Sequence, residues 1–544
     1  MSTSPEKNRA AWGSTILVFA VLLLNNLWEA DRCPLAGTEG HRAIAAHQMA
    51  ESGQWLFPKL YGQVYLRKPP LHYWMLAGLE KITGLSGEWI WRIPSVVAAG
   101  FTAAFLCFMA ARWFGPPAGL VSGLSYLALL VLWSQNRSAD VDAVNTLFSV
   151  IAACSLIELR SGRGPRPLPW SLLLAAAFGA ALLVKGPACL PLVLGTVVGL
   201  SLAFRSWSWL RRPAVWGGLV LGLLIFFSWA VTAWMTLRAG NQPVDLSGVD
   251  EATSRIFFTS LKDIPRIIAL PVVLLVYGLP LSFVLPFAFH SALRLNGADS
   301  SGPIVRSLTA SFFSALLVGI LAGLHNPRYG YLVLPLLCPL AGAVALALQE
   351  GRLPAPLQRS VLSLLAFSAL GFTALHLGLL GMVWHSVGVD FPLVVAGTLA
   401  LVLCVAALTA WLLNQPLAIG RTLILLLLLT TIPFARFNNG QRARRSGLHT
   451  SQSLRRVIKD SGRVSARNMV FFQPEIFYYA GVRVDALTGS PESQAPEKDC
   501  WMVLHWKELQ KWQAEAPGRL SCVTRLPTAK MGVYAAWYTA PQSK

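Results

Sequence analysis

The chain has 544 residues, of which 54% are hydrophobic and 13% are charged, and its formal net charge is +20. Because a soluble globular domain carries about 25% charged residues, this composition excludes an ordinary soluble fold. Apolar runs of the roughly 20 residues needed to cross a bilayer recur along most of the length. The basic residues stand in short loops between these runs, where membrane orientation or contact with anionic lipid explains them without a nucleic-acid partner.

Hydrophobicity predicts a mainly α, polytopic membrane protein of about thirteen spanning helices. The first helix is predicted to be retained, because no small-residue cleavage site closes it as in a signal peptide. The predicted spans are 12–28, 93–112, 116–134, 141–158, 169–184, 187–204, 214–236, 265–288, 308–324, 329–348, 360–383, 391–413 and 420–435.

Alternate loops between these spans are basic, and the positive-inside rule places the basic set in the cytoplasm. The other loops then face outward, among them residues 29–92, 237–264 and everything after 436. Nearly all of the unusual polar residues lie in these outward segments. The pattern therefore predicts that the chemistry is gathered on the outer side of the membrane.

The last segment, 437–544, alternates short strand-like runs with amphipathic helical patterns. This pattern predicts a small extracytoplasmic α/β domain after a membrane domain of residues 1–436. Two of the eight cysteines, Cys500 and Cys522, fall in it. A disulfide between them would suit an oxidising compartment, but spacing alone does not determine the pairing.

The first outward segment, 29–92, is too long for a simple connection. Residues 39–51 have a helical pattern with one apolar side, which favours a helix lying in the membrane interface. The segment ends in "YLRKPPLHYW", where Arg67 and Lys68 precede two prolines. The prolines restrict the backbone of Lys68 to extended conformations, so we interpret Lys68 as a cation held at the height of lipid phosphates.

An ordered set of short motifs runs along most of the chain, "RSADVDAVNTLF", "LLVKGPACLPLVL" and "HNPRYGYLVLPL" among them. Together with the first outward segment, this set resembles the GT-C glycosyltransferases that use polyprenyl-phosphate sugars, in particular the aminoarabinose lipid A transferases and the related protein mannosyltransferases. In the first outward segment, the matching residues are Glu39, Met49, Ser52, Gly53, Trp55, Lys68, Pro69, Tyr73 and Trp74. The resemblance implies a GT-C fold with a similar terminal domain.

The chain departs from the family pattern at the start of this segment. Thr38 stands where the family has an aspartate that is often the presumed catalytic residue, and His41 stands at a family arginine, with Arg42 next to it. Either Glu39 performs the catalytic work, or Asp31 or Glu29 reaches the site, or the chain has changed its substrate or lost activity.

Transfer of a sugar from a lipid phosphate needs a carboxylate near the acceptor and cations near the departing phosphate. The candidate catalytic residues are Glu39, Asp142 and Asp31. The candidate substrate-binding residues are Lys68, Arg67, His41, Arg42, Tyr73, Arg92, Arg137, Asp140, Lys185, Arg255, Arg328 and Tyr329. Glu39 and Asp142 could instead share a divalent metal ion; no other cofactor is expected.

We therefore expect an inverting hexosyl- or pentosyltransferase at the outer face of the cytoplasmic membrane. Its partners would be a polyprenyl-phosphate sugar donor, membrane lipids, and a lipid, glycan or protein acceptor. Two alternatives stay open: a lipid-linked sugar flippase, and a non-catalytic protein that binds polyprenyl phosphate. The absence of a clear internal repeat weighs against a transporter, whereas Thr38 keeps the non-catalytic alternative open.

Overall fold

The structure is a computed structural model, and it describes residues 5–162, 166–240, 264–290, 301–322, 327–387, 391–458, 463–467, 474–487, 496, 499–515, 518–526 and 533–539. The chain divides into two compact units. The first comprises Met1–Trp28, Ile93–Met235 and Leu246–Phe437, and the second comprises Glu29–Arg92, Thr236–Asp245 and Asn438–Lys544.

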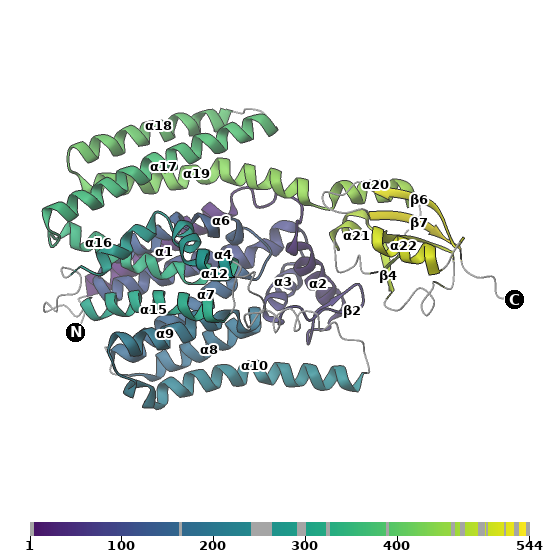
Figure 1. The fold of residues 1–544 in the computed structure, drawn as a ribbon, viewed down its shortest axis with the longest axis horizontal. Helices are drawn as coiled ribbons and strands as arrows, with labels where there is room; N and C mark the ends of the chain where they lie inside the picture. Colours follow the sequence, from purple (N-terminus) through teal and green to yellow (C-terminus); the bar gives the residue numbers. More distant parts are fainter. Residues whose placement is uncertain are drawn as a thin grey trace. The chain divides into compact units, whose positions relative to one another are not determined.

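The first unit is a helical bundle (Figure 1). Its helices are α1 (Pro5–Leu27), α4 (Glu88–Phe114), α5 (Pro116–Ser125), α6 (Leu130–Asn136), α7 (Asp142–Ser161), α8 (Leu168–Lys185), α9 (Leu190–Ala203), α10 (Pro213–Ala239), α12 (Ile264–Tyr277), α13 (Val284–Ala288), α15 (Ser301–Leu321), α16 (Leu337–Gln349), α17 (Ala355–Val387), α18 (Phe391–Leu412) and α19 (Pro416–Arg445). Short 3-10 segments join them: η1 (Tyr126–Ala128), η2 (Gly186–Cys189), η3 (Ser208–Arg211), η5 (Leu281–Phe283), η6 (Pro327–Leu332) and η7 (Leu334–Leu336). The ends of three of these helices, residues 88–92 of α4, 236–239 of α10 and 438–445 of α19, belong to the second unit.

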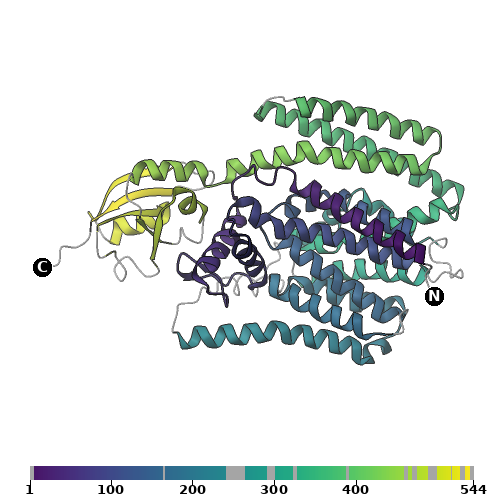
Figure 2. The same cartoon turned by 180° about the vertical axis from the view of Figure 1, so that it is seen from behind.

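Close packing of small residues holds the centre of this bundle together. Helix α15 lies along α9, and α8 lies along α7. A Cβ atom on Gly195 of α9 would be 2.2 Å from the Cα of Ala315, so only glycine permits this approach of α15. Small residues at helix contacts are typical of membrane proteins, where association depends on van der Waals packing. Helices α17, α18 and α19 form a further group (Figures 1 and 2), joined through Leu362, Ala410 and Ile419.

Within the described residues, ten helices are long and apolar enough to cross a membrane, or up to twelve if two bent pairs each count as one span. The predicted multi-pass, mainly helical architecture is confirmed. The predicted spans 169–184 and 187–204 fall in one stretch, Leu168–Ala203, which η2 interrupts.

Two predicted straight spans are instead sharply bent. The helical segments of 116–134 meet at 78°, and those of 265–288 meet at 107°. Leu129, with ψ 75°, leaves the helical conformation at the first bend, and the Trp133 indole N–H donates to the carbonyl of Leu127 at 2.7 Å. At the second bend stands Pro280, which has no N–H to continue a helix.

The second unit contains the first long loop and the C-terminal segment. The loop forms α2 (Thr38–Ser52), a small hairpin of β1 (Lys59–Leu60) and β2 (Gln63–Val64), and α3 (Leu71–Thr83). The C-terminal segment forms α20 (Leu448–Ile458), β3 (Arg463–Arg467), α21 (Glu475–Ala480), β4 (Arg483–Leu487), β5 (Cys500–His505), α22 (Trp506–Glu515), β6 (Leu520–Leu526) and β7 (Val533–Tyr538). The helix predicted over 39–51 is confirmed as α2, and its position in the membrane interface stays a prediction.

The five strands form one mixed sheet in the order β4-β3-β5-β7-β6, in which β3 pairs in parallel with β4 and β5. This confirms the predicted small C-terminal α/β segment. Cys500 and Cys522 are both free thiols. They lie on β5 and β6, which β7 separates, and two strand spacings of about 4.8 Å exceed the Cα separation of a disulfide.

Candidate active site

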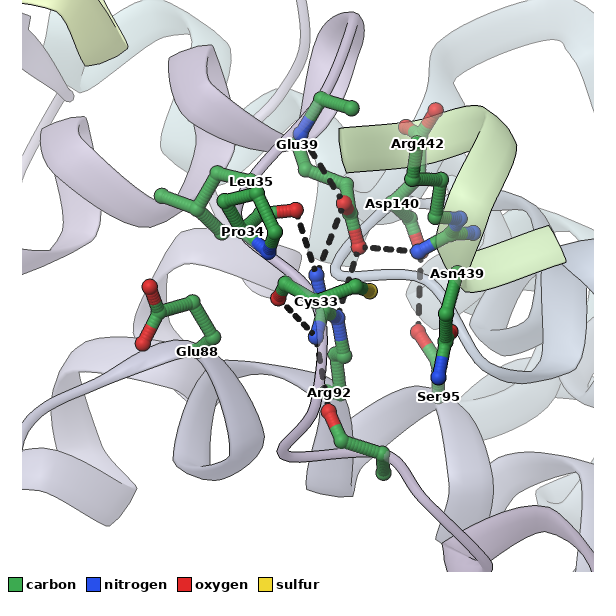
Figure 3. A network of polar contacts seen from close by, with 12 residues as sticks. Cys33, Pro34, Leu35, Glu39, Glu88, Arg92, Ser95, Asp140, Asn439 and Arg442 are labelled. Atoms are coloured by element: carbon green, nitrogen blue, oxygen red, sulfur yellow. Dashed lines mark hydrogen bonds and ion pairs between the residues drawn. The ribbon is translucent and has the colours of Figure 1, made fainter. Parts of the chain in front are cut away.

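The Glu39 carboxylate, at the start of α2, is the centre of a buried ion-pair network in the second unit (Figure 3). Its Oε1 accepts hydrogen bonds from Arg92 Nε at 3.0 Å and from Arg442 Nη1 at 2.9 Å. Its Oε2 accepts from Arg92 Nη2 at 3.1 Å and from the Ala36 backbone N–H at 3.2 Å. Glu39 is only 1% exposed and Arg92 is 0% exposed. Two cations and four donors thus hold this carboxylate in its ionised form.

Arg92 uses all of its donors inside this network. Beyond its two bonds to Glu39, Nη1 donates to the carbonyls of Ala30 at 2.7 Å and Cys33 at 2.9 Å, and Nη2 donates to that of Pro34 at 3.2 Å. A guanidinium has five N–H groups, and all five have acceptors here. The arrangement therefore favours a positioning role for Arg92, which fixes the irregular loop before α2 and orients Glu39.

Arg442 is a member of this network that the sequence reasoning missed. It lies near the end of α19, and Asn439, one turn earlier, donates from its amide to the Glu29 carbonyl at 3.1 Å. The signal was the polar and basic run "NNGQRARR" directly after the last apolar span. That run was interpreted only as the beginning of the terminal domain.

A second cluster combines Arg42 with aromatic side chains. Arg42 Nη1 donates to the Tyr73 hydroxyl at 2.8 Å and to the Tyr65 hydroxyl at 3.3 Å. The Arg67 guanidinium lies over the Tyr65 ring at 5.8 Å, and the His41 ring stacks on that ring at the same centroid distance. The structure thus brings four of the predicted binding residues, His41, Arg42, Arg67 and Tyr73, together around Tyr65.

Lys68 is half-buried in the bend directly after Arg67. Pro69 and Pro70 follow, and Pro70 caps the N-terminus of α3. Tyr73 and Trp74 lie in the first turn of that helix, where the Trp74 indole N–H donates to the Trp55 carbonyl at 2.5 Å. The segment "YLRKPPLHYW" is therefore a turn that leads into a helix with aromatic side chains in its first turn.

In the first unit, the structure pairs Asp142 with Lys185. Asp142 is the first residue of α7, Lys185 is the last residue of α8, and Lys185 Nζ donates to Asp142 Oδ1. Both side chains are buried. Their positions at adjacent helix ends explain the contact between residues 43 apart in sequence. Removing either partner would leave the other as an uncompensated buried charge.

Asp140 and Arg137 stabilise the backbone around this pair. The Asp140 carboxylate accepts from the Val141 N–H at 2.8 Å, and its carbonyl accepts from the Ser95 hydroxyl at 3.1 Å. The Arg137 guanidinium donates to the carbonyls of Asn25 and Trp28 at the end of α1. Cations at a helix C-terminus also interact favourably with the helix dipole.

Of the remaining candidates, the structure describes the side chain of Asp31, which is exposed in the turn after α1. Arg255 lies outside the described residues, and so do the side chains of Arg328 and Tyr329, whose backbone belongs to η6.

The donor set does not fit a divalent metal ion. Glu39 is neutralised by two guanidinium groups and Asp142 by an ammonium group, which opposes the approach of another cation. No group of three or more His, Cys, Asp or Glu residues suited to a metal occurs in the described part of the chain.

Known proteins are similar to this chain in sequence and in fold. Residues 67–234 match the model of the dolichyl-phosphate-mannose-protein mannosyltransferase family. The crystal structure of ArnT from Cupriavidus metallidurans bound to undecaprenyl phosphate superposes with a TM-score of 0.72 and 19% sequence identity, covering 97% of this chain and 99% of that one. The chain has the GT-C fold.

Two curated relatives extend this likeness to the sequence. Undecaprenyl phosphate-alpha-4-amino-4-deoxy-L-arabinose arabinosyl transferase 1 of Pseudomonas fluorescens is 28% identical over 422 residues, covering 74% of this chain and 69% of the relative. The corresponding transferase of Pseudomonas paraeruginosa is 27% identical, covering 61% of this chain and 58% of the relative. The resemblance to aminoarabinose transferases that the sequence predicts is confirmed.

Proposed function

We propose that the chain is an inverting glycosyltransferase that moves a sugar from a polyprenyl phosphate to a phosphate group of a lipid A-like acceptor. It would act at the outer face of the cytoplasmic membrane, with residues 437–544 as an extracytoplasmic domain after the membrane domain, 1–436. The observation that carries this proposal is the fold, shared along 97% of the chain with a transferase crystallised with undecaprenyl phosphate. Because the curated relatives use 4-amino-4-deoxy-L-arabinose, this pentose is the first sugar to test.

The donor phosphate would bind to the cations of the first loop. Lys68 is a point charge held by the following prolines, and Arg67 stands next to it. Their role is to balance the negative charge that develops on the departing polyprenyl phosphate, which is the largest electrostatic demand of the reaction. The engaged donors of Arg92 make it a positioning residue. Arg42 donates hydrogen bonds to two tyrosine hydroxyls and would stabilise the conformation of the first loop.

The pairing of the carboxylates favours a phosphate acceptor over a hydroxyl acceptor. A hydroxyl group must lose its proton to a general base during attack. Glu39 is bound to two arginines and Asp142 to a lysine, so both carboxylates are already engaged with cations in this arrangement. A phosphate monoester has a second pKa of about 6 and is ionised at neutral pH. Its oxygen can attack without a base.

The bonds and electrons of this reaction balance without a cofactor. An acceptor phosphate oxygen forms a bond to the anomeric carbon, while the bond from that carbon to the donor phosphate oxygen breaks. The electron pair of that bond goes to the polyprenyl phosphate, which leaves as an anion. Attack from the opposite face inverts the anomeric configuration.

The test uses the full chain in proteoliposomes with labelled polyprenyl-phosphate aminoarabinose and lipid A, followed by mass spectrometry of the lipids. We expect label on a lipid A phosphate. Label that crosses the bilayer without joining an acceptor would favour the flippase, and bound but untransferred donor would favour the non-catalytic alternative.

Lys68→Ala should weaken donor binding at least tenfold, because a charge-assisted contact contributes about 1.5–3 kcal/mol. Lys81→Ala, an exposed lysine on the neighbouring helix α3, is the matched control and should bind donor normally. Equal affinities of the two variants for donor would contradict the role assigned to Lys68.

A further inference from the structure

Helix α21 of the C-terminal segment contacts the first loop at several points within the second unit. The Tyr61 hydroxyl donates to the Pro474 carbonyl at 2.8 Å. The Tyr479 hydroxyl donates to Glu88 Oε1 at 2.8 Å and accepts from the Leu35 backbone N–H at 2.6 Å. Leu35 lies in the loop whose neighbouring carbonyls bind Arg92. The segment that precedes and forms α21 is therefore attached to the hairpin turn at Tyr61 and to the loop beside the Glu39 network at Leu35.

Glu475, the first residue of α21, is buried at this contact. It is 1% exposed, and within the described part of the chain its Oε2 has no hydrogen-bond partner. A Cβ atom on Gly40 would be 2.6 Å from this Oε2, and one on Gly447 would be 3.1 Å from the Glu475 Cγ. Gly40 is the residue that follows Glu39. Two glycines thus make room for this carboxyl group directly against the helix turn that carries Glu39.

We propose that Glu475 is a positioning residue for the Glu39 network: as a neutral carboxylic acid it packs α21 against α2 and keeps Glu39 aligned with Arg92 and Arg442. A buried carboxylate without a paired cation carries a large desolvation cost, so the enclosed geometry requires the neutral form. The inference rests on the proposed transfer reaction for its effect on activity, but not for its effect on folding.

The groups around Glu475 oppose its ionisation. From α2 it faces the Glu39 carboxylate, and from the turn between β1 and β2 it faces the Tyr61 phenol. Gly447, just before α20, contributes no charge, and the titratable residues of α20, His449, Arg455 and Arg456, are exposed. Burial, with the charge of Glu39 as a smaller cause, raises the pKa of Glu475 to about 8. Above that pH, two carboxylates would repel each other across the Gly40 turn.

Ionisation of Glu475 should lower the stability of the folded protein as the pH rises. Because the pKa of Glu475 is raised in the folded state, its stabilising contribution is complete below the ordinary pKa of 4.5 and is lost as the pH rises to about 8. The difference in Tm between Glu475→Gln and the wild type should therefore grow between pH 5 and pH 8 in favour of the variant. It should then stay constant up to pH 9. The exposed Glu515, on α22 of the same unit, provides the control variant Glu515→Gln. Its difference in Tm from the wild type should stay constant between pH 5 and pH 9.

The effect on transfer distinguishes positioning from simple packing. If only the neutral form of Glu475 keeps Glu39 aligned, wild-type activity falls roughly tenfold between pH 7 and pH 9, since the neutral fraction falls by that factor around a pKa of about 8. Glu475→Gln should keep the activity at pH 7 and lose this decline, whereas Glu515→Gln should decline like the wild type. An identical decline in Glu475→Gln and the wild type would overturn the inference.

A second variant keeps the test decisive if Glu475→Gln does not fold. Gly40→Ala places a methyl group against Glu475 Oε2, so it should reduce transfer severalfold. The reduction should be much smaller in a Glu475→Ala background, where the opposing carboxyl is gone. Additive effects would refute the contact. If the wild type transfers no sugar at any pH but the Tm differences follow the expected course, the proposed function fails and the assignment of neutral Glu475 stands.

Discussion

Replacing Glu39 by glutamine should destabilise the second unit severely, because the exchange removes the charge shared by two arginines. Arg92 is fully buried and Arg442 nearly so, with side-chain exposures of 0% and 12%. Removing one partner of a buried ion pair costs about 3–5 kcal/mol, since the other charge stays buried without compensation. For a unit of roughly 150–250 residues, each kcal/mol lowers Tm by about 2–4 °C. The expected loss is therefore on the order of 10 °C.

The assay is thermal unfolding of the purified full chain in detergent, followed by the fluorescence of its tryptophans. The matched control is Glu51→Gln, an exposed carboxylate at the other end of α2, which should change Tm by no more than about 1 °C. A double exchange of Glu39 and Arg92 to glutamine should cost less than the sum of the single exchanges, because it removes both charges of the pair. A shift for Glu39→Gln as small as that of the control would refute the network as the anchor of this loop.

Two further predictions concern other contacts. Glu80 accepts from His47 Nδ1 at 2.6 Å and raises the pKa of His47 above its usual 6.5, so this contact contributes stability at low pH that is lost as the pH rises through the raised value. Glu80→Gln should therefore lower Tm more at pH 6 than at pH 9, and an equal loss at both would contradict the ion pair. Gly195→Val should prevent the approach of α15 to α9 and abolish the folded protein in size-exclusion chromatography, whereas Gly371→Val, where a Cβ meets nothing within 4 Å, should express normally.

The sequence was sufficient for the features that depend on composition and local pattern. Membrane spans follow from long apolar runs, and α2 follows from its one-sided apolar pattern. The bends near Leu129 and Pro280 were not predicted, because apolar residues continue through both of them. Hydropathy indicates whether a segment lies in an apolar or an aqueous environment. It does not indicate where the axis of a helix changes direction.

The candidate site was predictable as a set of residues but not as a set of pairs. Lys185 and Asp142 were both identified, yet their contact depends on the packing of α7 against α8. Arg442 and Glu475 were missed, because neither the basic run around Arg442 nor the lone Glu475 indicates its partner, and both join the site only through the tertiary fold. Whether a carboxylate is available for catalysis is decided by such partners, so the sequence could not decide between catalysis and positioning for Glu39.

The bond between Arg442 and Glu39 joins residues that are 403 positions apart in the chain. Chains are synthesised at about 5–20 residues per second, so roughly 20–80 s pass before Arg442 can meet its partner. Until then, Arg92 is the one guanidinium of this network that can pair with the Glu39 carboxylate. Synthesis that stops before Arg442 therefore leaves this carboxylate with one of its two cationic partners.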